Sequence, residues 1–365
     1  MDSGKKQKGF IPKWVIVAPV LAWLGFFTIP YFATVKLFPL LLAILLISVV
    51  LAAVHHAEVV AHRVGEPFGT LILALSITII EVALIITIMT AGGEGTITLA
   101  RDTVFAAVML ILTGMIGICI LVGSFRYKVQ VFTLQGTSSA LITLTAIISF
   151  CLILPNYTTS KIGAQYTHLQ LIVIALVCLI LYISFVLFQT FRHRAFFLPP
   201  SENGNEDLYV EPPSLRTASV SMLFLIACLG IVVLLAKKLA PDIEYIVFKA
   251  GAPKALVGII IALVILLPEG LAAYRAARKN LLQTSLNLAM GSALASIGLT
   301  IPTVSLLAVF MGIEITLGID MKSTVLLLLS LFTIMLSLAT GRTNLLQGVV
   351  LLMIFVVYFF ITIIP

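Results

Sequence analysis

The sequence contains few charged residues. Only 10% of its 365 residues are Asp, Glu, Lys or Arg, against about 25% in an ordinary soluble domain. Hydrophobic residue types make up 61%, and the mean hydropathy is +1.20. So few charges cannot cover a soluble particle of 39.4 kDa, which excludes a soluble globular protein, a disordered chain and a nucleic-acid-binding module. The composition predicts a polytopic membrane protein, for which lipid is the outer solvent.

Cysteine is also scarce. The sequence has four, all in apolar stretches and none in a CxxC pair. We interpret them as small core residues and expect no redox chemistry, no zinc site and no resident cofactor. The cysteines are Cys119, Cys151, Cys178 and Cys228.

Long apolar runs dominate the chain. A membrane-spanning helix needs about 20 mostly apolar residues, and only helices or closed barrels satisfy their backbone in lipid. The runs are too long and uniform for barrel strands, so we predict an all-α fold. Eleven candidate transmembrane helices lie at 12–33, 35–54, 67–91, 102–124, 130–154, 167–191, 217–236, 254–274, 282–311, 323–341 and 344–364.

One polar segment divides the chain into two halves. Residues 192–216 hold Pro, Gly, Asn and four acids and predict a flexible cytoplasmic loop. A tail and first helix occupy 1–33, and five spans follow in each of 34–191 and 217–365. An odd number of spans inserts the two halves in opposite orientations, so we predict an inverted-topology repeat, which is typical of secondary transporters. A cytoplasmic N-terminus puts 14 of the 22 Lys and Arg residues inside, as the positive-inside rule favours.

The 15 acidic residues identify a candidate site. Thirteen lie in tails, connections or span edges, whereas Glu81 and Glu269 lie deep in apolar spans. An unpaired carboxylate there costs on the order of 3 kcal/mol, and no Lys or Arg lies mid-span as a partner. Each acid is in the second span of its half and follows a glycine, Gly69 or Gly258, by 12 or 11 residues. The repeat therefore predicts that the two carboxyls meet near the midplane.

Two facing carboxylates suit exchange of a cation for protons. Ionised, they form a −2 site for a metal cation that prefers oxygen ligands; protonated, they are neutral and tolerated at low dielectric. Because cation and protons compete for the same oxygens, their movements are coupled. We predict that Glu81 and Glu269 bind both in turn, and that the chain is a transporter and not an enzyme.

Further oxygen ligands lie near the two acids. Pro268 and Pro302 lack an N–H, so the carbonyls four residues earlier are released from helix hydrogen bonding. A stripe of hydroxyls spaced by four follows one face of the ninth span, although small residues at this spacing also suit close helix packing. The candidate auxiliary ligands are Ser76, Thr78, Val264, Ser292, Ser296 and Gly298, and Thr300 ends the stripe.

The segment HHAEVVAH precedes the third span. Glu58 and His62 share a helical face, which leaves three alternatives: an interfacial amphipathic helix on the cytoplasmic side, a pH-sensing or ion-entry site, or a zinc site. The candidate residues are His55, His56, Glu58 and His62.

Four segments resemble the calcium/cation–proton exchanger family of the cation/calcium exchanger superfamily, most of all its bacterial ChaA-type sodium(potassium)/calcium–proton antiporters. They are AEVVAHRVGEPFGTLILALSITIIEVALI at 57–85, LLPEGLAAYRAARKNLLQTSLNLAMGSALASIGLTIP at 266–302, YISFVLFQTFRHR at 182–194 and GRTNLLQGVVLL at 341–352. The resemblance implies an antiporter of the bacterial plasma membrane that extrudes Ca²⁺, Na⁺ or K⁺ in exchange for H⁺.

The family carries G-N-A-x-E in each repeat, and the resemblance assigns cation and proton binding to its acid, here Glu81 and Glu269. The Gly-Asn pair is absent: Ile77 and Thr78 replace it in the first half, Ile265 and Leu266 in the second. A later Gly-Ser pair matches Gly291 and Ser292, but the Gln that follows it is Ala295. A site with fewer amide oxygens is expected to favour Na⁺ or K⁺ as readily as Ca²⁺.

Two other functions stay open on the residues alone. A channel or uniporter would use the paired acids as a selectivity site, and an intramembrane hydrolase would use them for acid catalysis. The hydrolase would need positioning cations that neither flank offers. Expected partners are the lipid bilayer, inorganic cations and protons, with a homo-oligomer left open and no nucleic acid.

Overall fold

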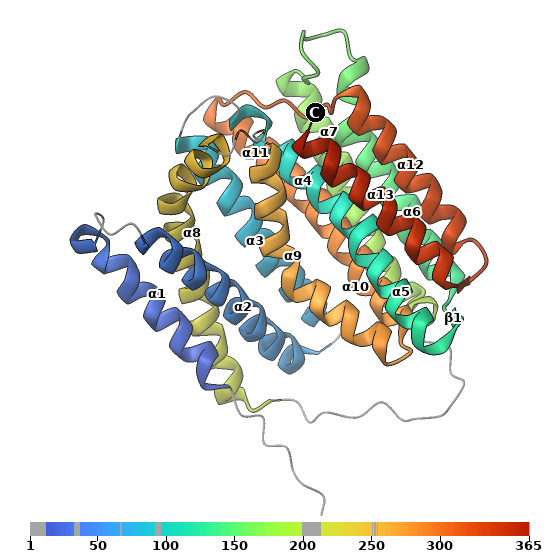
Figure 1. Cartoon of the computed structure of the whole chain (residues 1–365), viewed down its shortest axis with the longest axis horizontal. Coiled ribbons are helices and arrows are strands. Elements are labelled where there is room, and N and C mark those ends of the chain that lie inside the picture. Colours follow the sequence, from blue (N-terminus) through green and yellow to red (C-terminus); the bar gives the residue numbers. More distant parts are fainter. Residues whose placement is uncertain are drawn as a thin grey trace, which may run out of the picture. The chain divides into compact units, whose positions relative to one another are not determined.

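The structure is a computed structural model that describes residues 12–32, 37–65, 68–91, 96–198, 213–249, 251, 253 and 255–364. The described chain is almost entirely helical (Figure 1), which confirms the predicted all-α class. The acidic centre of the predicted 192–216 loop and the N-terminal tail lie outside the described residues.

Eight of the described helices are long and apolar enough to cross a membrane, and a bent ninth qualifies if its two halves count as one span. The first and third predicted spans contribute shorter apolar helices, at Lys13–Ile29 and Leu75–Thr90. Large apolar side chains such as Phe310 and Leu169 are mostly exposed, as expected of surfaces that face lipid. The count of eleven spans stays a prediction.

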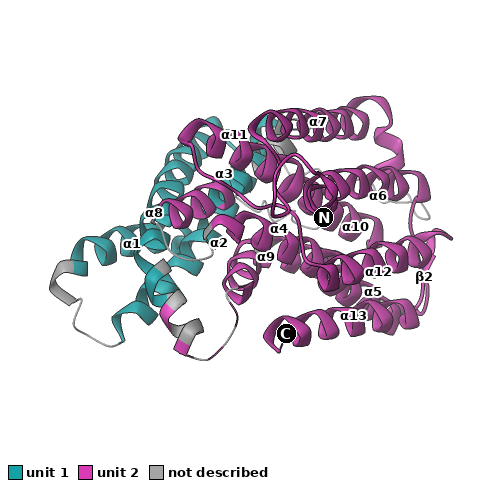
Figure 2. Ribbon diagram, turned by 90° about the horizontal axis from the view of Figure 1, so that it is seen from above, with its two compact units in different colours: residues 1–80, 205–242 teal, residues 81–204, 243–365 magenta. Residues whose placement is uncertain are grey.

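The helices form two compact units (Figure 2). The first holds residues 1–80 and 205–242. Within it, the Trp23 indole Nε1 on α1 donates to the Ala227 carbonyl oxygen on α8 at 3.3 Å. The elements of this unit are α1 (Lys13–Phe32), α2 (Phe38–Val64), α3 (Phe68–Ala91) up to Ile80, and α8 (Leu215–Lys249) up to Asp242.

The second unit holds residues 81–204 and 243–365 and includes the end of α3 from Glu81. Four of its spans contain a π-helical segment, a wider turn that is frequent at functional sites,. Its first-half elements are α4 (Leu99–Met109) with a π segment (Leu110–Met115), α5 (Ile116–Tyr127), β1 (Gln130–Val131), α6 (Leu134–Ile148) with a π segment (Ser149–Ile153), and α7 (His168–Leu187) with a π segment (Phe188–Arg192). Short 3₁₀ turns lie at Thr96–Thr98, Leu154–Tyr157 and Arg194–Phe197.

The second half of the chain is also helical. Its elements are α9 (Ala255–Arg278), α10 (Leu282–Ala295) with a π segment (Ser296–Thr300), α11 (Ile301–Met311), α12 (Met321–Leu338), β2 (Arg342–Thr343) and α13 (Leu345–Ile363). Its strand lies between α12 and α13, whereas the strand of the first half lies between α5 and α6.

Two helices extend beyond the predicted spans. The second span was predicted to end at residue 54, but α2 continues to Val64. The seventh was predicted to end at 236, but α8 continues to Lys249. Hydropathy detects only the apolar part of a helix, whereas the backbone hydrogen bonds continue through polar residues. The segment 55–62 is therefore the last third of α2 and not a separate interfacial helix.

The last helices of the two halves begin in the same way. Helix α7 begins with a capping box in which Thr167 and Gln170 exchange side-chain and backbone hydrogen bonds. Helix α13 begins with the same arrangement between Asn344 and Gln347. A capping box satisfies two backbone groups at a helix start. Its presence at both positions agrees with a duplicated helix order.

The connection between α11 and α12, residues 312–320, is a strap without regular secondary structure. It begins where Gly312 ends α11 in the left-handed conformation (φ 67°) and ends where Asp320 caps α12. Ile315, Leu317 and Ile319 are nevertheless only 3%, 1% and 4% exposed. Buried backbone outside helices must find other hydrogen-bond partners, and the neighbouring elements supply them.

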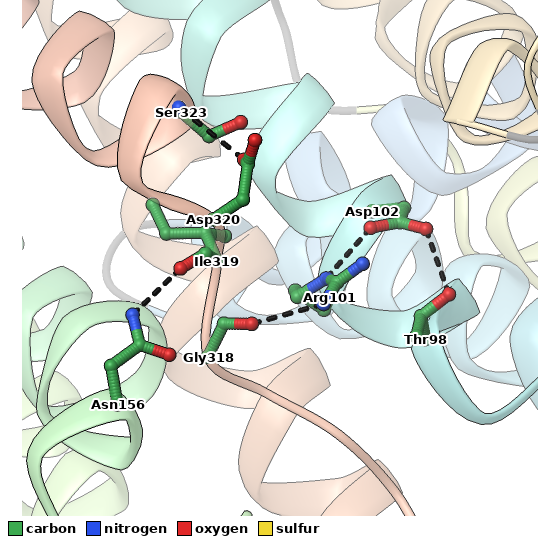
Figure 3. Close-up of polar contacts among 8 residues, drawn as sticks. All are labelled: Thr98, Arg101, Asp102, Asn156, Gly318, Ile319, Asp320 and Ser323. Atoms are coloured by element: carbon green, nitrogen blue, oxygen red, sulfur yellow. Dashed lines mark hydrogen bonds and ion pairs between the residues drawn. The ribbon is translucent and has the colours of Figure 1, made fainter. Parts of the chain in front are cut away.

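Hydrogen bonds from neighbouring segments hold the strap, and Figure 3 shows those made by the side chains of Arg101 and Asn156. The backbone contributes bonds from Thr316, Gly318 and Ile319 to the carbonyls of other segments. Side chains contribute the guanidinium of Arg101 on α4, which also pairs with Asp102, and the amide of Asn156. The distances are Thr316 N to Ile97 O 2.9 Å, Gly318 N to Ala164 O 3.1 Å, Ile319 N to Leu152 O 3.0 Å, Arg101 Nη1 to Gly318 O 3.0 Å and Asn156 Nδ2 to Ile319 O 2.6 Å.

The opposite end of α6 is held by a second connection. Strands β1 and β2 pair antiparallel, with Gln130 opposite Thr343. The Gln130 amide also donates to the Ala277 carbonyl at 3.3 Å and to Asn280 at 3.0 Å. Because the strap and this strand pair lie at the two ends of α6, the second unit is fastened at both ends of its bundle.

Candidate functional site

Glu81 begins the second unit on α3 and is 3% exposed. Each of its carboxyl oxygens accepts one hydroxyl hydrogen bond. Ser296 Oγ donates to Oε1 at 2.7 Å, and Thr300 Oγ1 donates to Oε2 at 2.8 Å. Both donors come from the π-helical segment that links α10 to α11. A carboxyl far from water is thereby hydrogen-bonded on both oxygens, as buried polar groups require.

Glu269 lies on α9 and is partly exposed. Its Oε2 accepts a 2.6 Å hydrogen bond from Ser292 Oγ of α10. The two parts of α9, Ala255–Leu267 and Glu269–Arg278, differ in direction by 55°. The bend falls at position 268, where the sequence has a proline, and the missing N–H of a proline interrupts helix hydrogen bonding.

One helix therefore serves both acids. Ser292, Ser296 and Thr300 are spaced by four residues. In an α-helix, residues four apart differ in direction around the axis by only about 40°. Ser292 contacts one carboxyl and Ser296 the other, so the two contact points lie about 6 Å apart along the helix. Hydroxyls of the α10–α11 span thus contact both acids, with Ser296 lying 215 residues from Glu81 in sequence; the meeting of the two carboxyls near the midplane stays a prediction.

The small residues of this span divide between two roles. Gly298 faces α7, where an added Cβ would lie 3.1 Å from Tyr182 Cβ. The glycine thus permits close helix packing, one of the two alternatives for this stripe. The hydroxyls of the stripe instead contact the carboxyls, as expected if the stripe supplies oxygen groups to the site. Sequence reasoning placed Thr300 on the stripe but omitted it from the ligand candidates; its spacing from Ser296 was the signal.

The other auxiliary ligands stay predictions. Ser76 and Thr78 are buried on α3 but belong to the first compact unit, not to the unit that contains Glu81. Val264 is partly exposed on α9, five residues before Glu269. Within the described part of the chain, no hydrogen bond joins the Val264 or Gly298 carbonyl to the acids.

The corresponding span of the first half offers no similar hydroxyl stripe. In α4 and its π segment, the Thr113 hydroxyl donates to the Met109 carbonyl of its own helix at 2.5 Å. Met115 of the same segment lies beside Gly270 of α9, 3.4 Å from the position of an added Cβ. The polar side-chain contacts of both acids therefore come from the second half of the chain.

Neither acid has a basic partner among the residues that the structure describes. The ion pairs found there join Arg101 to Asp102 and Lys161 to Glu314, each at 2.8 Å. The described chain also holds no group of three or more His, Cys, Asp or Glu that could bind a metal ion. Two carboxyls with three hydroxyls suit a transiently bound cation or proton better than a permanent metal centre.

The four residues of the HHAEVVAH segment do not form one site. His56 is fully buried, and His55 is partly buried. Glu58 and His62 are exposed elsewhere on α2. His56 is two positions from Glu58 and therefore points to a different side of the helix, whereas His55 lies three and seven residues from Glu58 and His62 and shares their face,. The zinc alternative finds no support among the described residues.

The sequence matches the family described as "Sodium/calcium exchanger protein" over residues 35–191 and 220–364. The chain is 44% identical over 321 residues to y4hA of Sinorhizobium fredii, a proposed ionic transporter, covering 88% of this chain and 87% of that protein. It is 34% identical over 351 residues to the sodium-potassium/proton antiporter ChaA of Escherichia coli, covering 94% of each.

Solved structures share the fold. The Ca²⁺/H⁺ antiporter YfkE superposes with a TM-score of 0.71 at 17% identity, covering 97% of this chain and 99% of that chain. The H⁺/Ca²⁺ exchanger CAX superposes with a TM-score of 0.69 at 16% identity, covering 94% and 86%.

Proposed function

Because the chain belongs to the sodium/calcium exchanger protein family, we propose that it is a secondary antiporter that exchanges Ca²⁺, Na⁺ or K⁺ for protons across the bacterial plasma membrane. The antiport activities of the ChaA and YfkE relatives support this. The observation that carries the proposal is the placement of Glu81 and Glu269 against hydroxyls of one helix, without a basic partner.

The two carboxyls bind cation and protons in turn. With the site open to the cytoplasm, Glu81 and Glu269 release protons and their oxygens bind the cation. With the site open to the other side, protons displace the cation. The loaded forms carry little net charge, whereas the empty, doubly ionised site is costly to hold at low dielectric. Movement without cargo is therefore suppressed, which couples the two fluxes.

The three hydroxyls serve every state of the site. A Ser or Thr hydroxyl both donates and accepts hydrogen bonds. Ser292, Ser296 and Thr300 donate to the carboxylates when these are ionised. They accept a hydrogen bond when the carboxyls are protonated, and they offer a lone pair to a cation. The site thus keeps its polar groups satisfied through the cycle, which avoids the penalty of unpaired buried groups.

The identity of the cation is testable by direct transport. Membrane vesicles with the cytoplasmic face outward and a pH dye inside should report proton movement when Ca²⁺, Na⁺ or K⁺ is added separately. Glu81→Gln and Glu269→Gln keep the size of the side chain but cannot exchange a proton, so each should abolish proton-coupled flux. Glu314→Gln is the matched control, because Glu314 lies on the exposed part of the strap with its side chain 62% exposed, and it should leave the flux unchanged.

Full activity in either site variant would refute the two-acid mechanism. Cation flux that continues in wild-type vesicles without moving protons would instead establish the channel or uniporter alternative.

A further inference from the structure

His56 joins all three long helices of the first compact unit. It lies on α2 and is 0% exposed. Its ring stacks on Phe224 of α8, with centroids 5.3 Å apart and planes 14° from parallel. Its Nε2 lies 3.1 Å from the carbonyl oxygen of Val15 on α1. The side chain is thus the point where α1, α2 and α8 meet.

The hydrogen bond determines which nitrogen carries the proton. A carbonyl oxygen only accepts hydrogen bonds, so the Nε2 of His56 must donate to Val15. In the neutral ring the other nitrogen, Nδ1, is then bare. Nδ1 is buried and has no hydrogen-bond partner. The structure therefore accommodates a neutral His56. If Nδ1 were protonated, its N–H would have no hydrogen-bond acceptor.

Among the residues that the structure describes on the helices around His56, no acidic side chain faces this ring. The described helix α1 carries one charged residue, Lys13, and residues 217–236 of α8 carry none. Residues 75–80 of α3 also carry none. On α2 itself, the nearest titratable neighbour is His55, whose ring centroid lies 6.0 Å away. Glu58 is exposed two positions along, where a residue points to another side of the helix,.

We propose that His56 is a proton sensor that loosens α1 from α2 and α8 when the adjoining compartment becomes acidic, and thereby slows transport. Protonation of Nδ1 would put an unpaired N–H and a positive charge into an apolar interface. The charged ring is accommodated better where water reaches it, which requires the three helices to separate. The effect on transport rests on the proposed antiport function; the loosening of α1 does not.

The site lies at the cytoplasmic end of these helices if the N-terminus is cytoplasmic. Val15 is in the first turn of α1, and His56 is about 12 Å from the end of α2 at Val64,. An antiporter that extrudes cations brings protons into the cytoplasm. A sensor at this end would stop turnover before the acid load became large, in the manner of negative feedback.

The transport experiment separates the sensor from simple proton competition. Vesicles with the cytoplasmic face outward are given a saturating cation concentration, so that protons no longer compete at the transport site. The outer pH is then lowered from about 8 to about 5.5 across the range in which histidine titrates, while the inner pH is held constant. The maximal rate of the wild type should fall about tenfold.

His56→Gln should remove this fall, because its amide can donate to Val15 but does not titrate. His56→Phe, which can stack on Phe224 without titrating, is a second variant in case the first folds poorly. His55→Gln and His62→Gln are matched controls that should retain the fall. An unchanged pH profile in both His56 variants would overturn the proposal.

Tryptophan fluorescence tests the structural step without transport. The chain has two tryptophans, Trp14 and Trp23, and both lie on α1. Their emission in purified protein in lipid nanodiscs should change with the same pH midpoint as the maximal rate, and it should stay constant in His56→Gln. No pH-dependent change in the wild type would overturn the sensor. A change in emission in a protein that transports none of the three cations would refute the antiport function and leave the loosening of α1 standing.

Discussion

The hydroxyl contacts of Glu81 give a quantitative prediction. Ser296→Ala removes the 2.7 Å hydrogen bond to Oε1 and leaves the Thr300 bond to Oε2. A hydrogen bond to a charged group contributes about 1.5–3 kcal/mol. Its loss disfavours the ionised carboxylate, which the cation needs, relative to the protonated form. At about 1.4 kcal/mol per factor of ten, the apparent KM for the cation should rise roughly 10- to 100-fold at neutral pH.

The same argument predicts how pH offsets the change. Because cation and protons compete for one carboxylate, raising the pH by about one to two units should restore the KM. The maximal rate at saturating cation should change little, since the carboxyl is still present. The assay is the initial rate of proton-coupled flux in vesicles against cation concentration, repeated at several pH values.

A control lies on the same span. Ser305 is 2% exposed on α11, and its hydroxyl has no hydrogen-bond partner. Ser305→Ala therefore removes a buried hydroxyl without touching either acid and should leave the KM unchanged. An unaltered KM for Ser296→Ala at every pH, or an equal rise for Ser305→Ala, would refute the reasoning. A rise that is the same at every pH would contradict the competition argument, whereas a smaller residual rise at alkaline pH would reflect the loss of Ser296 as a cation ligand.

The remaining predictions concern stability. Gly318→Ala should lower the thermal unfolding midpoint in detergent, because the added Cβ would collide with the side-chain oxygen of Asn156 in the strap. Gly348→Ala should destabilise by about 1–3 kcal/mol, because its Cβ would lie 2.7 Å from a backbone nitrogen of α5; Gly291→Ala, with nothing within 4 Å of the added Cβ, is the control for both and should melt like the wild type. The hydrogen bond from its lysine partner, Lys161, holds the pKa of Glu314 below its ordinary value, so the stability this pair contributes is present at neutral pH and is lost as the pH falls through the lowered pKa. Glu314→Gln should remove that part of the acid dependence of the melting temperature, and a curve that superposes on the wild type would contradict it.

Most of the helical organisation was predictable from local sequence. Hydropathy is a property of about 20 consecutive residues, so the spans and the isolation of Glu81 and Glu269 within them follow without knowledge of the fold. The helix ends were less predictable. Helix α2 continues to Val64 because backbone hydrogen bonding does not stop where apolar residues do,.

The contacts of the candidate site were only partly predictable. The spacing of Ser292, Ser296 and Thr300 indicated a shared helical face, but not that the face contacts both acids. The carbonyl of Gly298 stays a predicted ligand; what the sequence did not indicate is that the missing side chain of this glycine allows close approach to Tyr182. The burial of His56 between α1 and α8 was missed because His56 was grouped with the polar residues of its segment, although its helical neighbours Ala53 and Val60 are apolar and buried,.

The sequence by itself determined that this chain is a membrane protein and that two carboxyls lie within apolar segments. Both follow from local sequence, because the free energy of placing a charged side chain in lipid depends on the residues that surround it along the chain. Only the tertiary structure decided which groups satisfy those carboxyls. Ser296 and Glu81 are 215 residues apart, and the Arg101 and Asn156 side chains that hold the strap lie 217 and 163 residues from the residues they bond. Contacts between residues so far apart in sequence arise from helix packing, in which small residues and π-helical turns decide which helix faces meet. No local sequence pattern encodes such contacts.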